Sequence, residues 1–157
     1  MMAGGGHAFD QPSPAGLVRE FHLGLAAHDV DGLWSGDSKE KGPDLCMEVI
    51  FNRSLFHLLS ATAYPNVGAS LNTQGDTSKI YGGSMLQWEP VSAFFFSIGL
   101  GLALHNGERD TDSADRKSLG SRLLFRIPIE IGYAINPRHR IILAFDHVSN
   151  AGLASPN

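Results

Sequence analysis

Residues 94–105 read FFFSIGLGLALH, and bulky and small side chains alternate along the whole stretch. One set of alternate positions is bulky and apolar: Phe94, Phe96, Ile98, Leu100, Leu102 and Leu104. The other set is mostly small or polar: Phe95, Ser97, Gly99, Gly101, Ala103 and His105. A period of two indicates a β-strand, because successive side chains of a strand point to opposite faces. We therefore predict a strand with one bulky apolar face and one small face.

The same alternation recurs along the chain. Six further strands are predicted over residues 20–27, 45–52, 66–71, 80–88, 123–133 and 140–149. Polar connections follow the first, third and fifth strands, whereas those after the fourth and sixth are short, which is typical of outer-membrane barrels. Residues 53–64 are apolar and fit either an extension of the second strand or a short helix.

Composition narrows the class of protein. The chain has 157 residues, 43% of them hydrophobic and 18% charged, with a net charge of −4. This length fits one domain with a real core, and the apolar content excludes general disorder. The acidity argues against a nucleic-acid partner, which usually meets a basic patch. The single Cys46 forms no internal disulfide, and the sequence has no Cys/His spacing of a structural zinc site.

Two architectures fit the strand pattern. A membrane barrel turns the bulky face to lipid, whereas a soluble barrel or sandwich turns it inward. The Gly, Ser and Ala side chains of residues 94–105 make a poor solvent face, which favours the membrane barrel. The apolar run at residues 92–104 is too short for a transmembrane helix, but a membrane β-strand needs only about 9–11 residues.

Single-chain bacterial barrels contain an even number of strands, with eight as the smallest, and seven strands are predicted here. The fold expected is all-β, an antiparallel up-and-down eight-stranded barrel whose closing strand is missing from this chain. Residues 1–16 are expected to be an unstructured N-terminal segment, and residues 17–157 a single barrel domain, incomplete at its C-terminus. The N-terminus has no Lys, Arg or apolar core and does not look like a signal peptide.

One polar pair interrupts an apolar strand face. His147 and Ser149 follow Ile141, Leu143 and Phe145 on the same face of the strand at residues 140–149. Their Cα atoms should be about 6.5 Å apart, close enough for a base and a nucleophile to hydrogen-bond. Alternatively the strand reaches a polar headgroup zone there, and the spacing alone favours this second reading. Of the other histidines, His22 and His105 fall on the inner face, and those near strand ends, such as His28, carry no signal.

The string FDHVSNAGLASPN at residues 145–157 resembles the active-site segment of PagL-type lipid A 3-O-deacylases. The resemblance extends upstream through AHD at 27–29, GLWSG at 32–36, PNVGASLN at 65–72, GDTSK at 75–79, HNG at 105–107 and LGSR at 119–122. It implies an eight-stranded barrel of the bacterial outer membrane. It also implies a serine carboxylic-ester hydrolase that removes the acyl chain at position 3 of lipid A in lipopolysaccharide, without a cofactor or a metal.

The resemblance also implies roles for individual residues. Ser149 is the expected nucleophile and His147 the base, and the Gly152 backbone and Asn157 side chain are the expected oxyanion donors. The third triad member is a Glu expected after Asn157, so no residue of this chain receives that role. Lipopolysaccharide and outer-membrane lipid are the expected partners, with a homodimer left open. The alternatives are a non-catalytic outer-membrane or lipid-binding barrel, and an inactive fragment of the esterase.

Overall fold

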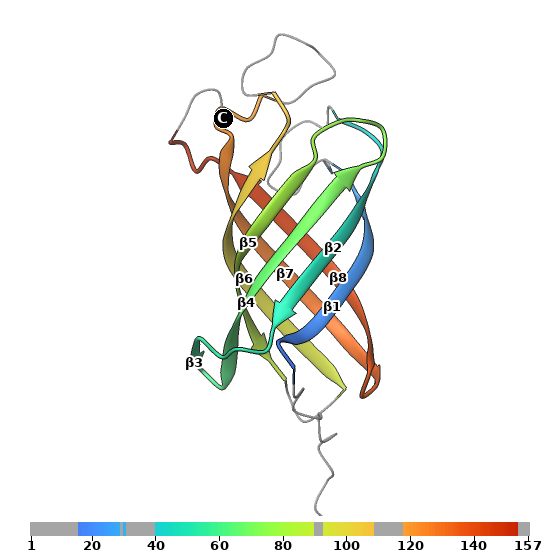
Figure 1. Ribbon diagram of the computed structural model, residues 1–157, viewed down its shortest axis with the longest axis vertical. Helices are drawn as coiled ribbons and strands as arrows, with labels where there is room; N and C mark the ends of the chain where they lie inside the picture. Colours follow the sequence, from blue (N-terminus) through green and yellow to red (C-terminus); the bar gives the residue numbers. More distant parts are fainter. Residues whose placement is uncertain (1–15, 29, 31–39, 90–92, 109–117, 154–157) are drawn as a thin grey trace, which may run out of the picture.

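The computed structural model describes residues 16–28, 30, 40–89, 93–108 and 118–153, and all the regular elements in these ranges are β-strands (Figure 1). The strands are β1 (Val18–Ala27), β2 (Pro43–Phe51), β3 (Phe56–Leu58), β4 (Ala61–Asn72), β5 (Lys79–Trp88), β6 (Phe94–His105), β7 (Leu123–Asn136) and β8 (His139–Ser149). The seven predicted strands are confirmed, most of them with longer ends. Among the described residues, no helix is long and apolar enough to cross a membrane. The expected unstructured segment at residues 1–16 lies almost wholly outside these ranges.

The long strands form one antiparallel sheet in the order β1-β2-β4-β5-β6-β7-β8. Each long strand therefore pairs with its neighbours in sequence, apart from the insertion of β3, and the sheet curls into an open barrel (Figure 1). In the described part of the chain, β1 and β8 are the two edges of this sheet. The predicted all-β, up-and-down architecture is confirmed.

The prediction for residues 53–64 is wrong, because they neither extend β2 nor form a helix. They contain β3, which pairs with the first residues of β4. The two-residue turn between them consists of Leu59 and Ser60, both with positive φ, as tight hairpin turns require. Pro65 lies between the part of β4 that pairs with β3 and the part that pairs with β2. Proline has no N–H to donate, and it is tolerated at this position because Pro65 is paired with neither β2 nor β3.

The two faces of the sheet differ as the alternation predicts. Leu25, Leu100 and Leu143 point outward and are 77%, 64% and 77% exposed. Buried polar side chains line the inner face of the strands: Glu48, Asn66, Ser70, Gln87, Ser97, Arg126 and Glu130. Apolar side chains thus point outward and polar side chains inward, as predicted for a membrane barrel. A soluble barrel would have the reverse arrangement.

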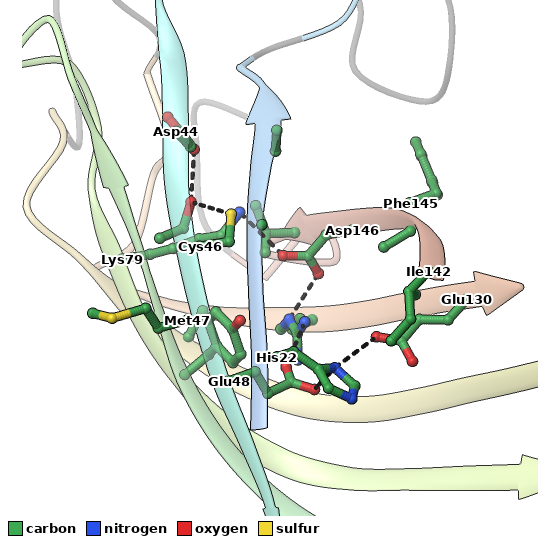
Figure 2. A pocket seen from close by; sticks show the side chains of 18 of the residues that line it. His22, Asp44, Cys46, Met47, Glu48, Lys79, Glu130, Ile142, Phe145 and Asp146 are labelled. Carbon is green, nitrogen blue, oxygen red and sulfur yellow. Dashed lines mark hydrogen bonds and ion pairs between the residues drawn. The ribbon is translucent and has the colours of Figure 1, made fainter. Parts of the chain in front are cut away.

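Ion pairs connect strands across the interior. The Arg126 guanidinium donates to Asp146 at 2.7 Å and lies 3.2 Å from Glu48. Figure 2 shows the Glu48 side chain next to His22. Arg140 of β8 donates to Glu20 of β1 at 3.2 Å. This last ion pair joins the two edge strands through the interior, so side chains connect the two edges of the sheet.

Candidate active site

The outer face of β8 ends in the predicted polar pair. His147 is paired with Ile127 of β7, and Ser149 is paired with Phe125. Both polar side chains are half-buried, and they project on the same side as Ile141 and Leu143. The structure therefore brings His147 and Ser149 together on one face, at the apolar outer surface, as the sequence predicts.

Asp146 lies on the other side of the strand. Its carboxylate accepts from the Nε of Arg126 at 2.7 Å and lies 3.2 Å from the Nζ of Lys79. This acid is engaged in the interior ion pairs and cannot orient His147 from the outer face.

A tight turn follows Ser149. Ala151 and Gly152 have φ values of 53° and 75°, and the Leu153 N–H donates to the Asn150 carbonyl at 3.0 Å. Two consecutive positive φ angles bend the chain sharply, at a cost of roughly 1–2 kcal/mol for a residue with a Cβ such as Ala151. The chain therefore changes direction directly after β8.

Asn150 holds this turn and is only 4% exposed. Its side-chain oxygen accepts the N–H of Gly152 at 2.8 Å, and its amide donates to the Leu119 carbonyl at 3.3 Å. The N–H of Gly152, an expected oxyanion donor, is thus held by the Asn150 side chain in this structure. Asn157, the other expected donor, lies outside the described residues.

The pair lies at the rim where the long connections emerge. The segments that join β1 to β2, β4 to β5 and β6 to β7 all leave the barrel at the end of β8 that carries Ser149 (Figure 1). The short β7–β8 turn and β3 lie at the opposite rim.

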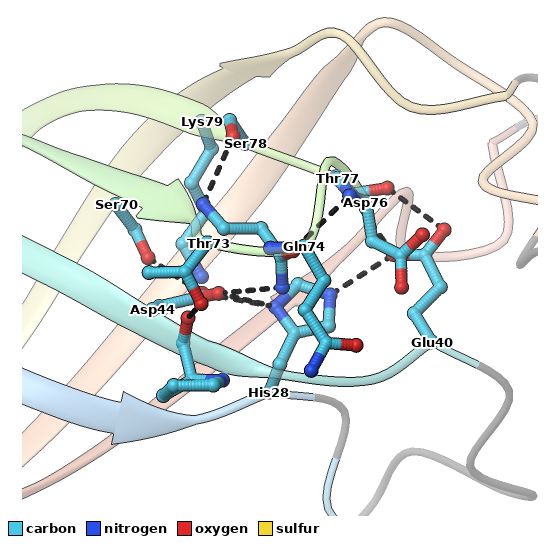
Figure 3. Close-up of polar contacts among 12 residues, drawn as sticks. His28, Glu40, Asp44, Ser70, Thr73, Gln74, Asp76, Thr77, Ser78 and Lys79 are labelled. Carbon is cyan, nitrogen blue, oxygen red and sulfur yellow. Dashed lines mark hydrogen bonds and ion pairs between the residues drawn. The ribbon is translucent and has the colours of Figure 1, made fainter.

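A second polar cluster at this rim centres on His28, just after β1 (Figure 3). The Nδ1 of His28 is 2.9 Å from Asp44, and its Nε2 is 2.9 Å from Glu40. Glu40 in turn accepts from the hydroxyl of Thr77 at 2.9 Å, and Asp44 from that of Ser70 at 2.7 Å. The hydrogen bonds to Asp44 and Glu40 raise the pKa of His28 to about 9, so both ring nitrogens donate at neutral pH.

The roles of His28 and Asn150 could not be predicted from the sequence. His28 carried no signal because its partners are 12 and 16 residues away. Only the β1–β2 register, which pairs Ala26 with Asp44, brings them together. Asn150 stands out in the sequence only as part of the string at residues 145–157, and its burial depends on contact with Leu119, 31 residues earlier in the chain.

Comparisons with known proteins identify the family of the chain. A family model described as "Lipid A 3-O-deacylase (PagL)" matches residues 6–157. A curated relative, "Lipid A deacylase PagL" of Bordetella bronchiseptica, is 33% identical over 73 residues, which are 46% of this chain and 39% of that protein. The matched stretch thus spans well under half of the relative. The search of solved structures returned no significant match.

Proposed function

The chain belongs to the PagL family of lipid A 3-O-deacylases, and we propose that it is a serine esterase that hydrolyses the ester-linked acyl chain at position 3 of lipid A. One observation carries this proposal. His147 and Ser149 share the outer face of β8, next to a sharp turn, within the segment that the family model matches.

The proposed location is the bacterial outer membrane. The outer face of the sheet is apolar and exposed, and the long strands have 9–14 residues, whereas a tilted membrane strand needs about 9–11. Outer-membrane barrels direct their longer loops to the cell exterior. With that orientation, His147 and Ser149 face sideways into the outer leaflet, which is where lipopolysaccharide resides.

The proposed chemistry needs only proton transfer and acyl transfer. Ser149 Oγ attacks the ester carbonyl while His147 takes its proton, and His147 then protonates the sugar oxygen that leaves. Water, activated by the same imidazole, releases the fatty acid from the acylated serine. No described residue is assigned as the acid that would orient His147.

The oxyanion would be held by the Gly152 N–H and the Asn157 amide. Removing one such donor typically lowers kcat about 10²–10³-fold. Because the Gly152 N–H donates to Asn150 in this structure, it must be shared with, or transferred to, the oxyanion when substrate reacts.

The test is mass spectrometry of lipid A after incubation with the folded chain. Ser149→Ala should abolish release of the 3-linked hydroxy fatty acid. The matched control is Ser84→Ala, which removes a hydroxyl from the outer face of β5. If Ser149→Ala keeps the parent's activity, the proposed nucleophile is wrong. A folded parent that leaves lipid A unchanged would favour one of the two alternatives instead, the non-catalytic barrel or the inactive fragment of the esterase.

A further inference from the structure

Three ionisable side chains from three strands converge inside the barrel, away from His147 and Ser149. His22 comes from β1, Glu48 from β2 and Glu130 from β7, and Figure 2 shows the three side chains turned toward one another. The Nδ1 of His22 lies 3.9 Å from Glu48 Oε1 and 3.9 Å from Glu130 Oε1. One atom from each side chain lies within 4.8 Å of the other two.

Two carboxylate oxygens in this cluster lack a hydrogen-bond partner. Among the residues that the structure describes, Glu48 Oε1 and Glu130 Oε2 are buried without one. Both residues are only 4% exposed. Buried polar groups are normally satisfied, and a buried anion is satisfied by a cation or by donors. The unpartnered Oε1 of Glu48 is one of the atoms turned toward His22.

The neighbours of the cluster are arranged as around a metal site. The Nε2 of His22 is 2.9 Å from Glu20 Oε2. A neutral His22 that donates from Nε2 to Glu20 would have its Nδ1 lone pair available for a metal ion. A histidine that binds a metal through one ring nitrogen usually donates the other to a carboxylate in this way. The second oxygen of Glu48 is likewise held by Arg126, at 3.2 Å.

We propose that His22 Nδ1, Glu48 and Glu130 bind one divalent metal ion, zinc or an ion with similar ligand preferences, inside the barrel. One imidazole nitrogen and two carboxylate oxygens suit zinc, whereas calcium and magnesium prefer oxygen ligands alone. Zinc at about 2.0–2.1 Å from each ligand requires ligand atoms about 3.3 Å apart. The 3.9 Å distances from His22 Nδ1 to the two carboxylates would each shorten by about 0.6 Å on binding.

The interior leaves room for a fourth ligand and a route to the site. The same three side chains line a cavity of about 1880 Å³ that extends to the rim beside His28. A bound ion would cross-link β1, an edge strand, to β2 and β7. The role proposed for this ion is therefore structural, although His147 and Ser149 of β8 line the same cavity.

The first experiment measures zinc binding to the full chain, folded in detergent and stripped with a chelator, by calorimetry and elemental analysis. One equivalent per chain is expected. His22→Asn and Glu130→Gln should each weaken binding at least about 100-fold, and Glu20→Gln should weaken it about 10–100-fold. The control is His57→Asn, an exposed histidine at the opposite rim, which should change nothing. Failure to bind zinc, or binding that depends on His57 and not on Glu130, would overturn the proposal.

A second measurement does not depend on whether the interior variants fold. X-ray absorption of zinc bound to the unaltered chain should show one imidazole among light oxygen ligands. A spectrum with two or more imidazoles would assign the ion to surface histidines and would equally overturn the proposal.

Discussion

The side-chain oxygen of Asn150 accepts the backbone N–H of Gly152 at 2.8 Å, while its amide donates to the Leu119 carbonyl. One buried side chain thus joins the turn after β8 to the segment that precedes β7. The direction in which the Gly152 N–H points depends on this contact. Asn150 is therefore a positioning residue for the oxyanion donor that we propose.

Asn150→Ala should lower kcat for ester hydrolysis about 10–100-fold with little change in KM. The expected loss is smaller than the 10²–10³ of a deleted oxyanion donor, because the N–H remains but is no longer held in place. The measurement is steady-state kinetics with an ester substrate in mixed micelles. Asn136→Ala is the control, since Asn136 accepts two turn N–H groups at the opposite rim. Equal losses in both variants would point to a general effect on folding.

His147→Asn and Ser149→Ala should each remove nearly all activity, and the double variant should be no worse than either. Residues that act as one catalytic unit show this non-additivity, whereas independent contributions multiply. Single-turnover rates of the two single variants and the double variant test it. A double variant slowed by the product of the two single effects would mean that the residues act separately.

The strands and their faces were predictable because period-two alternation survives in each of them, most clearly in residues 94–105. The position of His147 and Ser149 on one face followed from the same rule. The interior clusters were not predictable. His22, Glu48 and Glu130 meet only because the curled sheet brings β7 close to β1 and β2, and no spacing along the chain encodes that curvature. The hairpin at β3 was missed because a turn with positive φ at Leu59 and Ser60 has no glycine to signal it.

The His28 cluster should make stability depend on pH. Since Asp44 and Glu40 raise the pKa of His28 to about 9 from 6.5, protonated His28 stabilises the fold fully below about pH 6.5. This stabilisation is lost as the pH rises through about 9. Urea unfolding should therefore show a larger cost for His28→Gln at pH 6.5 than at pH 10. A cost that does not change with pH would mean that His28 is not charged in the folded chain.

Arg126→Met should destabilise the barrel by about 3–5 kcal/mol, because it removes the cation from the buried Glu48 carboxylate and leaves the partly exposed Asp146 with Lys79 alone. The guanidinium also lies 3.7 Å from the centre of the Tyr81 ring, a contact that methionine replaces only in part. Denaturant titration in detergent measures the difference. Arg138→Met is the control, because Arg138 is exposed in the β7–β8 turn. A cost below about 1 kcal/mol would indicate that the carboxylates are satisfied by other groups.

Gly132→Ala should destabilise the fold by about 1–3 kcal/mol, the usual cost of overpacking a filled interior. Gly132 of β7 is paired with Phe95 of β6, and a Cβ added at Gly132 would overlap the Phe95 ring. The ring cannot easily move away, because it is only 3% exposed and the Arg140 guanidinium lies 4.7 Å from its centre. Gly24→Ala is the matched control, because a Cβ added at Gly24 of β1 meets nothing within 4 Å. Unfolding free energies of the two variants should differ by at least about 1 kcal/mol, and equal values would mean that the Phe95 ring does not rest on Gly132 in solution.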